Sequence, residues 1–90
     1  MPRKHIIVHG HVQGVGFRYF AMRAAQAADV TGWVRNRWDG GVEIEAQGDK
    51  ASLLLFADAL RRGPGFANVD SLDIKNVSEV GGEDSFRVKM

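Results

Sequence analysis

The stretch GHVQGVGFR, residues 10–18, decides how the first part of the chain folds. Residues 4–12, which end inside this stretch, alternate apolar and polar side chains as a half-buried strand does. Gly14 and Gly16 then interrupt the alternation, and apolar residues recur at helical spacing from Phe17 onward. The stretch therefore predicts a strand, a tight glycine-rich loop and the first turn of a helix, in that order.

The same loop has the features of a cradle for a small anion. Backbone N–H groups converge in a tight glycine loop, and a helix N-terminus adds a partial positive charge. Arg18 would lie in the first helical turn, where the helix dipole favours an acidic residue over a cation. An arginine there makes sense if an anion lies between its guanidinium group and the loop, because the planar guanidinium suits phosphate bidentately.

Length and composition are those of one small globular domain spanning residues 1–90. Apolar residues make up 44% of the chain and charged residues 26%. The chain has no cysteine, which excludes disulfides, thiolate catalysis and cysteine-ligated zinc. The apolar segment Ile6–Val8 is too short for a signal-peptide core, and no segment could span a membrane. We therefore expect a cytoplasmic protein.

The charge distribution matters more than the total charge. A formal net charge of +1 provides no global basic field for nucleic acid. Arg18, Arg23, Arg35 and Arg37 nevertheless fall in the N-terminal half, so we expect a local positive patch that attracts a small anion. For Arg23 and Arg37 a solvated basic surface is the favoured interpretation.

The middle of the chain contains a hairpin. Residues 33–38 and 42–47 flank Asp39-Gly40, which is a strong hairpin signal between two such segments. The first helix extends to about Ala28, and Gly32 lies where a helix C-terminus commonly ends.

A second helix begins after Asp49, a good N-cap residue, and extends to about Arg62. Its apolar residues form one stripe that we expect to be buried, namely Leu53, Phe56, Ala57 and Leu60. Strands over 72–77 and 86–90 complete the order β-α-β-β-α-β plus a short terminal strand. This order predicts an α+β, ferredoxin-like split β-α-β fold, with both helices on one face of a mainly antiparallel sheet.

Asn36 is the second unusual residue, because asparagine is depleted in strands. By alternation it shares a face with Val34 and Trp38, the apolar side of that segment. A polar amide there needs hydrogen-bond partners. It either bonds a neighbouring loop, as most such amides do, or points at a water or ligand near the glycine loop.

Two separate motifs at this spacing resemble a known family. GHVQGVGFR at residues 10–18, followed by GWVRN at residues 32–36 and the Asp-Gly turn, is similar to the signatures of the acylphosphatase family. The resemblance covers nearly the full chain, with a looser match at Val69 and Leu72 and a variable residue at His11.

The resemblance implies hydrolysis of the carboxyl–phosphate bond of acyl phosphates, without metal or cofactor. It implies that Arg18 binds the phosphoryl group and that Asn36 positions the attacking water. The backbone groups implied to hold the phosphoryl oxygens belong to Gln13, Gly14, Val15, Gly16, Phe17 and Arg18. Substrates implied by the family include carbamoyl phosphate, acetyl phosphate and glycolytic acyl phosphates, and nothing in the sequence selects one of them.

Other polar residues have structural interpretations that we favour. His5, His9 and His11 share one strand face, but no further ligand is placed to complete a metal site, so an exposed polar face is expected. Glu43, Glu45 and Asp49 could serve as acid or base. The alternation of the two glutamates with apolar residues favours a solvated strand face, and Asp49 is favoured as a helix cap.

A binding module on the same fold is the alternative function. Trp33, Trp38 and Phe17 with the arginines could stack nucleic-acid bases, but packing in the core or on the sheet is favoured for both tryptophans. Such a module would bind a small anion or single-stranded nucleic acid without catalysis. Similar domains also form the N-terminal part of larger carbamoyl-transferring maturation proteins. We expect a free-standing monomeric enzyme, with no nucleic-acid or membrane partner.

Overall fold

The computed structural model describes residues 1–90, and its elements follow the expected order. They are β1 (Arg3–His11), α1 (Phe17–Ala28), β2 (Thr31–Asn36), β3 (Val42–Gln47), α2 (Lys50–Arg62), β4 (Asn68–Val77) and β5 (Phe86–Val88). The fourth strand starts at Asn68, earlier than the expected start at residue 72. The reason is that β1 pairs with β4 as far as His11↔Asn68, across a register shift between His9 and Gly10.

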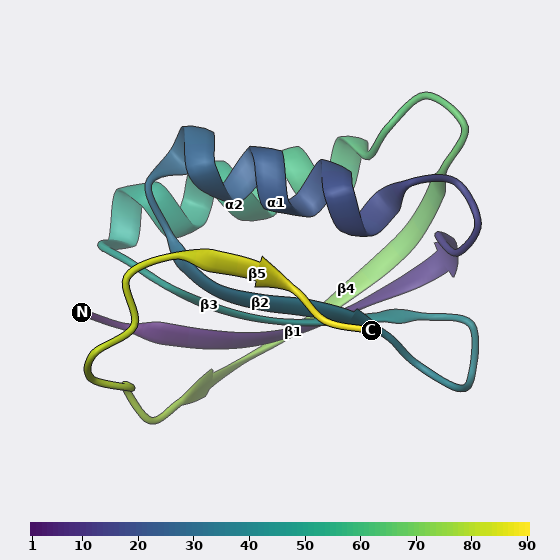
Figure 1. Ribbon diagram of the computed structural model, residues 1–90. Helices are drawn as coiled ribbons and strands as arrows, with labels where there is room; N and C mark the ends of the chain where they lie inside the picture. Colours follow the sequence, from purple (N-terminus) through teal and green to yellow (C-terminus); the bar gives the residue numbers. More distant parts are fainter.

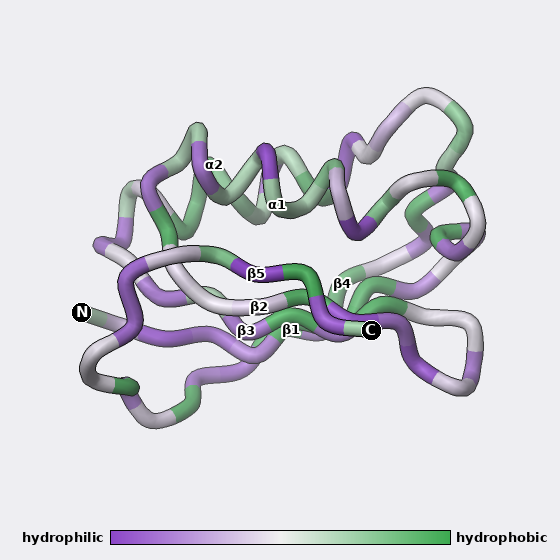
Figure 2. Tube along the Cα trace, in the orientation of Figure 1, coloured by the Kyte–Doolittle hydropathy of each residue, from purple (hydrophilic) through white to green (hydrophobic).

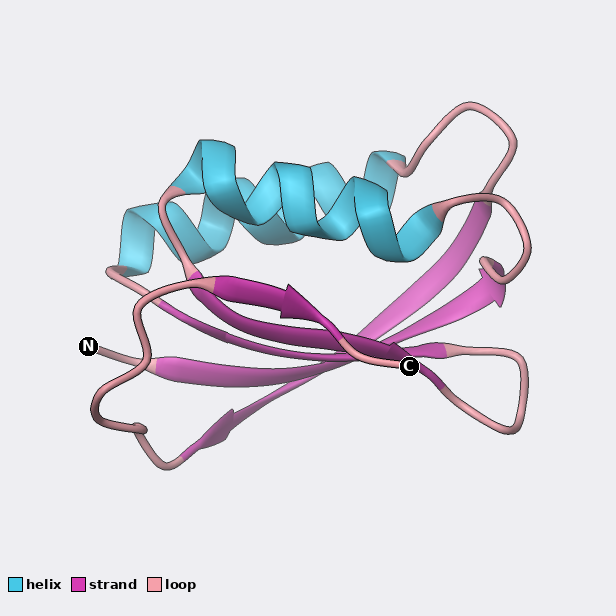
Figure 3. Cartoon of the chain, in the orientation of Figure 1, coloured by secondary structure: helices cyan, strands magenta, loops and turns pink.

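The strands form one sheet in the order β4-β1-β3-β2-β5. All neighbours are antiparallel except β2 and β5, which are parallel. Both helices lie across one face of this sheet, and the other face carries no helix (Figures 1 and 3). The expected α+β, ferredoxin-like arrangement is therefore confirmed.

The core lies between the helices and the sheet, and Figure 2 shows hydrophobic segments on both layers. On β3, Val42, Ile44 and Ala46 are fully buried, as their alternation predicts. The expected stripe of α2 is buried in full, namely Leu53, Phe56, Ala57 and Leu60. Asp49 caps that helix by accepting a hydrogen bond from the Ser52 N–H at 2.8 Å.

The expected role of Gly32 is wrong. Helix α1 ends at Ala28, and Asp29 takes the left-handed conformation (φ 61°) that closes it. Aspartate tolerates this conformation better than most residues, which is why no glycine is needed there. Gly32 instead lies in β2 with φ 143°, where a Cβ atom would clash with the backbone carbonyl of Glu45 on β3.

The face without helices carries a network of ion pairs. Glu43 and Glu45 belong to this network, whereas the sequence predicts a solvated strand face for them. Arg3 is only 3% exposed, and its Nε donates to Glu45 at 2.7 Å while its Nη1 donates to Glu83 at 2.8 Å. Glu43 accepts from Arg35 at 2.7 Å. These side chains cover the open face of the sheet because each finds its partner on a neighbouring strand or on the loop before β5.

The two tryptophans differ. Trp33 is half-buried on the open face, with Lys89 Nζ 4.4 Å from its ring centroid, so it packs on the sheet as expected. Trp38 is 94% exposed at the tip of the hairpin, so the expectation of core or sheet packing is wrong for this residue. The reason is that β2 ends at Asn36, two residues before Trp38, so the alternation of the strand no longer applies there.

Candidate functional site

The loop between β1 and α1 leaves a helix N-terminus open. Gly16 is the N-cap of α1, with φ 76°, and it supplies no side-chain cap. No backbone N–H group from Gln13 to Tyr19 donates a hydrogen bond to another group of the chain. These unpartnered donors and the helix dipole make the loop locally positive, as an anion cradle requires.

Arg18 lies in the first turn of α1, as the sequence predicts, and this turn has no acidic residue. Its side chain is half-buried and reaches the end of the chain, where Nη1 donates to the Lys89 carbonyl at 3.1 Å. The same Nη1 lies 3.9 Å from the sulfur of Met90. These contacts steady the guanidinium group and leave most of its five donors available.

Five of the seven predicted site residues line one small concavity of about 110 Å³. Gly14, Gly16 and Arg18 line it from the loop and α1, and Asn36 lines it from the end of β2. Val12, Phe17 and Tyr19 complete the lining. Asn36 is exposed and no side-chain hydrogen bond holds its amide. Loop, guanidinium and amide, which lie up to 22 positions apart (36 − 14), therefore share one surface.

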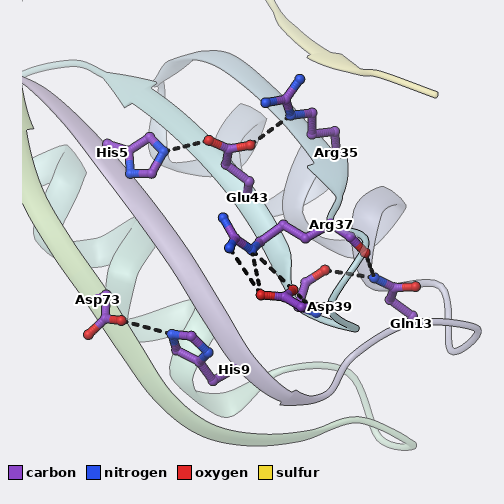
Figure 4. Close-up of polar contacts among 9 residues, drawn as sticks. His5, His9, Gln13, Arg35, Arg37, Asp39, Glu43 and Asp73 are labelled. Atoms are coloured by element: carbon purple, nitrogen blue, oxygen red, sulfur yellow. Dashed lines mark hydrogen bonds and ion pairs between the residues drawn. The ribbon is translucent and has the colours of Figure 1, made fainter.

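Gln13 and Val15 do not line the concavity. Val15 packs partly buried against the core. The side chain of Gln13 turns toward the β2–β3 hairpin, where Nε2 donates to the carbonyls of Arg37 at 2.6 Å and Gly41 at 2.8 Å (Figure 4). The sequence predicts a role for the backbone of Gln13 alone. The available signal was an uncharged residue with two amide donors, set directly before the glycines.

The hairpin beside Asn36 is held by a local ion pair. Arg37 Nη2 lies 3.0 Å from Asp39 Oδ2, and Asp39 Oδ1 accepts from the Gly41 N–H at 3.1 Å (Figure 4). The hydrogen bond from Arg37, with that from Gly41, holds the pKa of Asp39 below its ordinary value. The bond to Asp39 likewise raises the pKa of Arg37. The guanidinium group of Arg37 is thus paired within the hairpin turn.

Histidines and glutamates of the open face pair among themselves. His5 Nε2 lies 2.6 Å from Glu43 Oε2, and His9 Nε2 lies 2.8 Å from Asp73 Oδ2 (Figure 4). Burial raises the pKa of Glu43, but the hydrogen bonds from His5 and Arg35 outweigh it, so the pKa lies below the ordinary value. No three His, Asp or Glu side chains are grouped to hold a metal ion. Neither helix has the length and apolar character needed to cross a membrane.

Comparisons with known proteins agree along almost the whole chain. The family model described as Acylphosphatase matches residues 4–88. The chain is 46% identical to the acylphosphatase of Moorella thermoacetica over 89 residues, which are 99% of this chain and 95% of that protein. The crystal structure of acylphosphatase from Bacillus subtilis superposes with a TM-score of 0.95 at 39% identity, covering 100% of both chains.

A larger protein contains a similar domain. The crystal structure of T. kodakarensis HypF matches with a TM-score of 0.87 at 34% identity, covering 100% of this chain but 12% of that one. Family model, relatives and solved structures thus agree on one family and on one arrangement of the fold. The chain belongs to the acylphosphatase family.

Proposed function

We propose that this chain hydrolyses the carboxyl–phosphate bond of small acyl phosphates, with Arg18 and Asn36 as its catalytic residues. Acyl phosphate hydrolysis follows from membership of the family. The observation that carries the residue assignment is the shared concavity, in which the loop, Arg18 and Asn36 face the same space of about 110 Å³.

The phosphoryl group binds at the loop. The free N–H groups from Gln13 to Arg18 donate to its non-bridging oxygens, and the guanidinium group of Arg18 adds two parallel hydrogen bonds. Negative charge spread over these oxygens in the transition state is stabilised by donors that are already in position. Binding in this way depends on the phosphoryl group, which all acyl phosphates share.

Asn36 orients the attacking water through its amide. The water oxygen forms a bond to phosphorus as the bond from phosphorus to the acyl oxygen breaks, and the electron pair of that bond leaves on the carboxylate. The water proton passes to a phosphoryl oxygen, because an amide is too weak a base to take it. The carboxylate is a weak base, so it leaves without a general acid. Asn36 therefore contributes by positioning the water and not by transferring a proton.

The same proposal includes the setting in which the enzyme acts. Residues 1–90 form a single domain that is monomeric, cytoplasmic and metal-independent. A formal net charge of +1 supports a small anionic substrate rather than a nucleic-acid partner.

The test is hydrolysis of benzoyl phosphate in excess EDTA by wild type, Arg18→Gln and Asn36→Ala. We expect metal-independent turnover by wild type. Asn36→Ala should lower kcat by about 100-fold or more, as loss of a positioning group does, while the inhibition constant of inorganic phosphate changes little. Arg18→Gln should weaken phosphate binding and turnover together.

Two variants control for changes of residue type away from the concavity. Arg23→Gln removes an exposed arginine from the same helix, and Asn76→Ala removes an amide from β4. Both should keep the wild-type rate. A folded Asn36→Ala protein with normal kcat contradicts the role of Asn36, and a folded wild type without activity contradicts the proposed function.

A further inference from the structure

The side chain of Gln13 connects the two walls of the candidate site. Gln13 directly precedes Gly14 in the loop, and Arg37 directly follows Asn36 in the hairpin. Both hydrogens of the Gln13 amide are used, one on the Arg37 carbonyl at 2.6 Å and one on the Gly41 carbonyl at 2.8 Å. The Gln13 amide therefore links the glycine loop to the strand end that carries Asn36.

No other hydrogen bond joins the loop to the hairpin. Residues 12–16 donate no backbone hydrogen bond to residues 36–41 and accept none from them. The hairpin itself is closed independently, because the Arg37 N–H donates to the Gly41 carbonyl at 2.9 Å and Asp39 bonds both residues. Loss of the Gln13 amide would thus free the loop relative to the hairpin without opening the hairpin.

Glutamine suits this position better than its acid or its shorter amide. The two acceptors are carbonyl oxygens, so the contacting group must supply two N–H donors and carry no negative charge. Glutamate would place a carboxylate against both carbonyls, and asparagine is one methylene group too short. A partly buried amide with both donors satisfied has one preferred orientation, which makes it a rigid spacer.

We propose that Gln13 is a positioning residue, whose amide sets the distance between the loop that binds the phosphoryl group and Asn36. The inference rests on the proposed function. Gln13 acts through the placement of Asn36, so it governs kcat rather than phosphate affinity. Displacement of a reacting group by about 1 Å can cost 100-fold in rate.

The experiment is a double-mutant cycle on kcat for benzoyl phosphate with Gln13→Ala, Asn36→Ala and the double variant. We expect Gln13→Ala to lower kcat by about 10- to 100-fold, with the inhibition constant of inorganic phosphate within about threefold of wild type. In the Asn36→Ala background, Gln13→Ala should have no further effect, because the group that it positions is already gone. A residue that merely stabilises the fold would lower kcat in both backgrounds.

Gln13→Glu adds a readout that does not depend on the alanine variant being well folded. When its carboxyl is protonated it can donate one hydrogen bond to a carbonyl, whereas the carboxylate cannot. Its kcat should therefore rise as the pH falls through the pKa of the new carboxyl, relative to wild type at the same pH. Gln47→Glu is the matched control. Gln47 Nε2 also donates to a backbone carbonyl, that of Val80, at 2.9 Å, and its Oε1 accepts from the Val80 N–H at 2.9 Å. It should show no such rise.

Each result decides the matter. Wild-type kcat in folded Gln13→Ala, equal losses of kcat and phosphate affinity, or a Gln13 effect that persists without Asn36 overturns the inference while the proposed function stands. A pH profile of Gln13→Glu that parallels wild type also overturns it. An inactive wild type overturns the proposed function and this inference together.

Discussion

The positive charge of Arg18 lies in the first turn of α1, where the helix dipole disfavours a cation. It follows an uncapped helix N-terminus whose N–H groups have no partners in the chain, and no acidic residue of that turn offsets its charge. A cation in the first helical turn costs about 0.3–1 kcal/mol at an exposed site. A bound anion removes this cost, so stability and ligand binding are coupled at this residue.

Inorganic phosphate should therefore stabilise the protein. At a concentration about 100 times its dissociation constant, a ligand that binds only the folded state adds about 2.7 kcal/mol to the free energy of unfolding. We expect Arg18→Gln to lose most of the resulting rise in melting temperature. Arg23→Gln, which alters an exposed arginine on the same helix, should retain it. Thermal melts with and without phosphate measure both, and an equal rise in wild type and Arg18→Gln contradicts the assignment.

At the scale of elements, β2 depends on its close approach to β3. The strand carries Asn36 at its end and pairs with β3 from Thr31↔Gln47 to Asn36↔Val42. Gly32 makes this approach possible, because any Cβ atom there would clash with the Glu45 carbonyl and its φ of 143° is unsuited to a side chain. A change at Gly32 therefore acts on the whole strand.

Gly32→Ala should destabilise the protein by more than about 2 kcal/mol, since it combines backbone strain with a steric clash. Gly81 is the control, because a Cβ atom there meets no heavy atom within 4 Å and its φ is not positive. Gly81→Ala should change stability by less than about 1 kcal/mol. Urea unfolding followed by circular dichroism compares the two, and similar midpoints for Gly32→Ala and wild type would show that β2 can shift away from β3.

Local signals predicted the elements well, and non-local contacts account for what was wrong or missed at Gly32 and Gln13. Asp49 and the apolar stripe of α2 act within their own helix, so their roles could be deduced from spacing alone. The expected role of Gly32 was wrong because the requirement for glycine comes from β3. Its paired residue there, Ala46, lies fourteen positions further along the chain (46 − 32). The two donor contacts of Gln13, 24 and 28 residues along the chain, were missed for the same reason.

Across the whole molecule, the open face of the sheet makes stability depend on pH. Glu43 and Glu83 are each partly buried, which raises the pKa of both, but hydrogen bonds from His5 and Arg35 to Glu43 and from Arg3 to Glu83 outweigh burial. Both carboxyl groups thus have a lower pKa in the folded state than in the unfolded chain.

The sign of the effect follows from linkage. An unfolded chain with the higher pKa binds more protons in mild acid, so protonation favours unfolding. The stabilisation is complete above the ordinary glutamate pKa of about 4.3 and is lost as the pH falls through the lower folded value. We expect the free energy of unfolding to fall by about 1 kcal/mol between neutral pH and about pH 3, allowing for solvent screening of the pairs. Glu43→Gln should be less stable than wild type at neutral pH and show a flatter pH dependence. Denaturant titrations across this range measure it, and an unchanged slope contradicts the role of Glu43.

The position of β1 inside the sheet has a consequence for the order in which the protein forms during synthesis. β1 is made before both of its partners, which begin at Val42 and Asn68, so both of its edges stay unpaired until later parts of the chain are made. Pairing between such distant segments slows folding relative to a helical domain of similar size. The loop after β1 leaves the ribosome early, but it meets Asn36 only after β3 has emerged and paired with both β1 and β2.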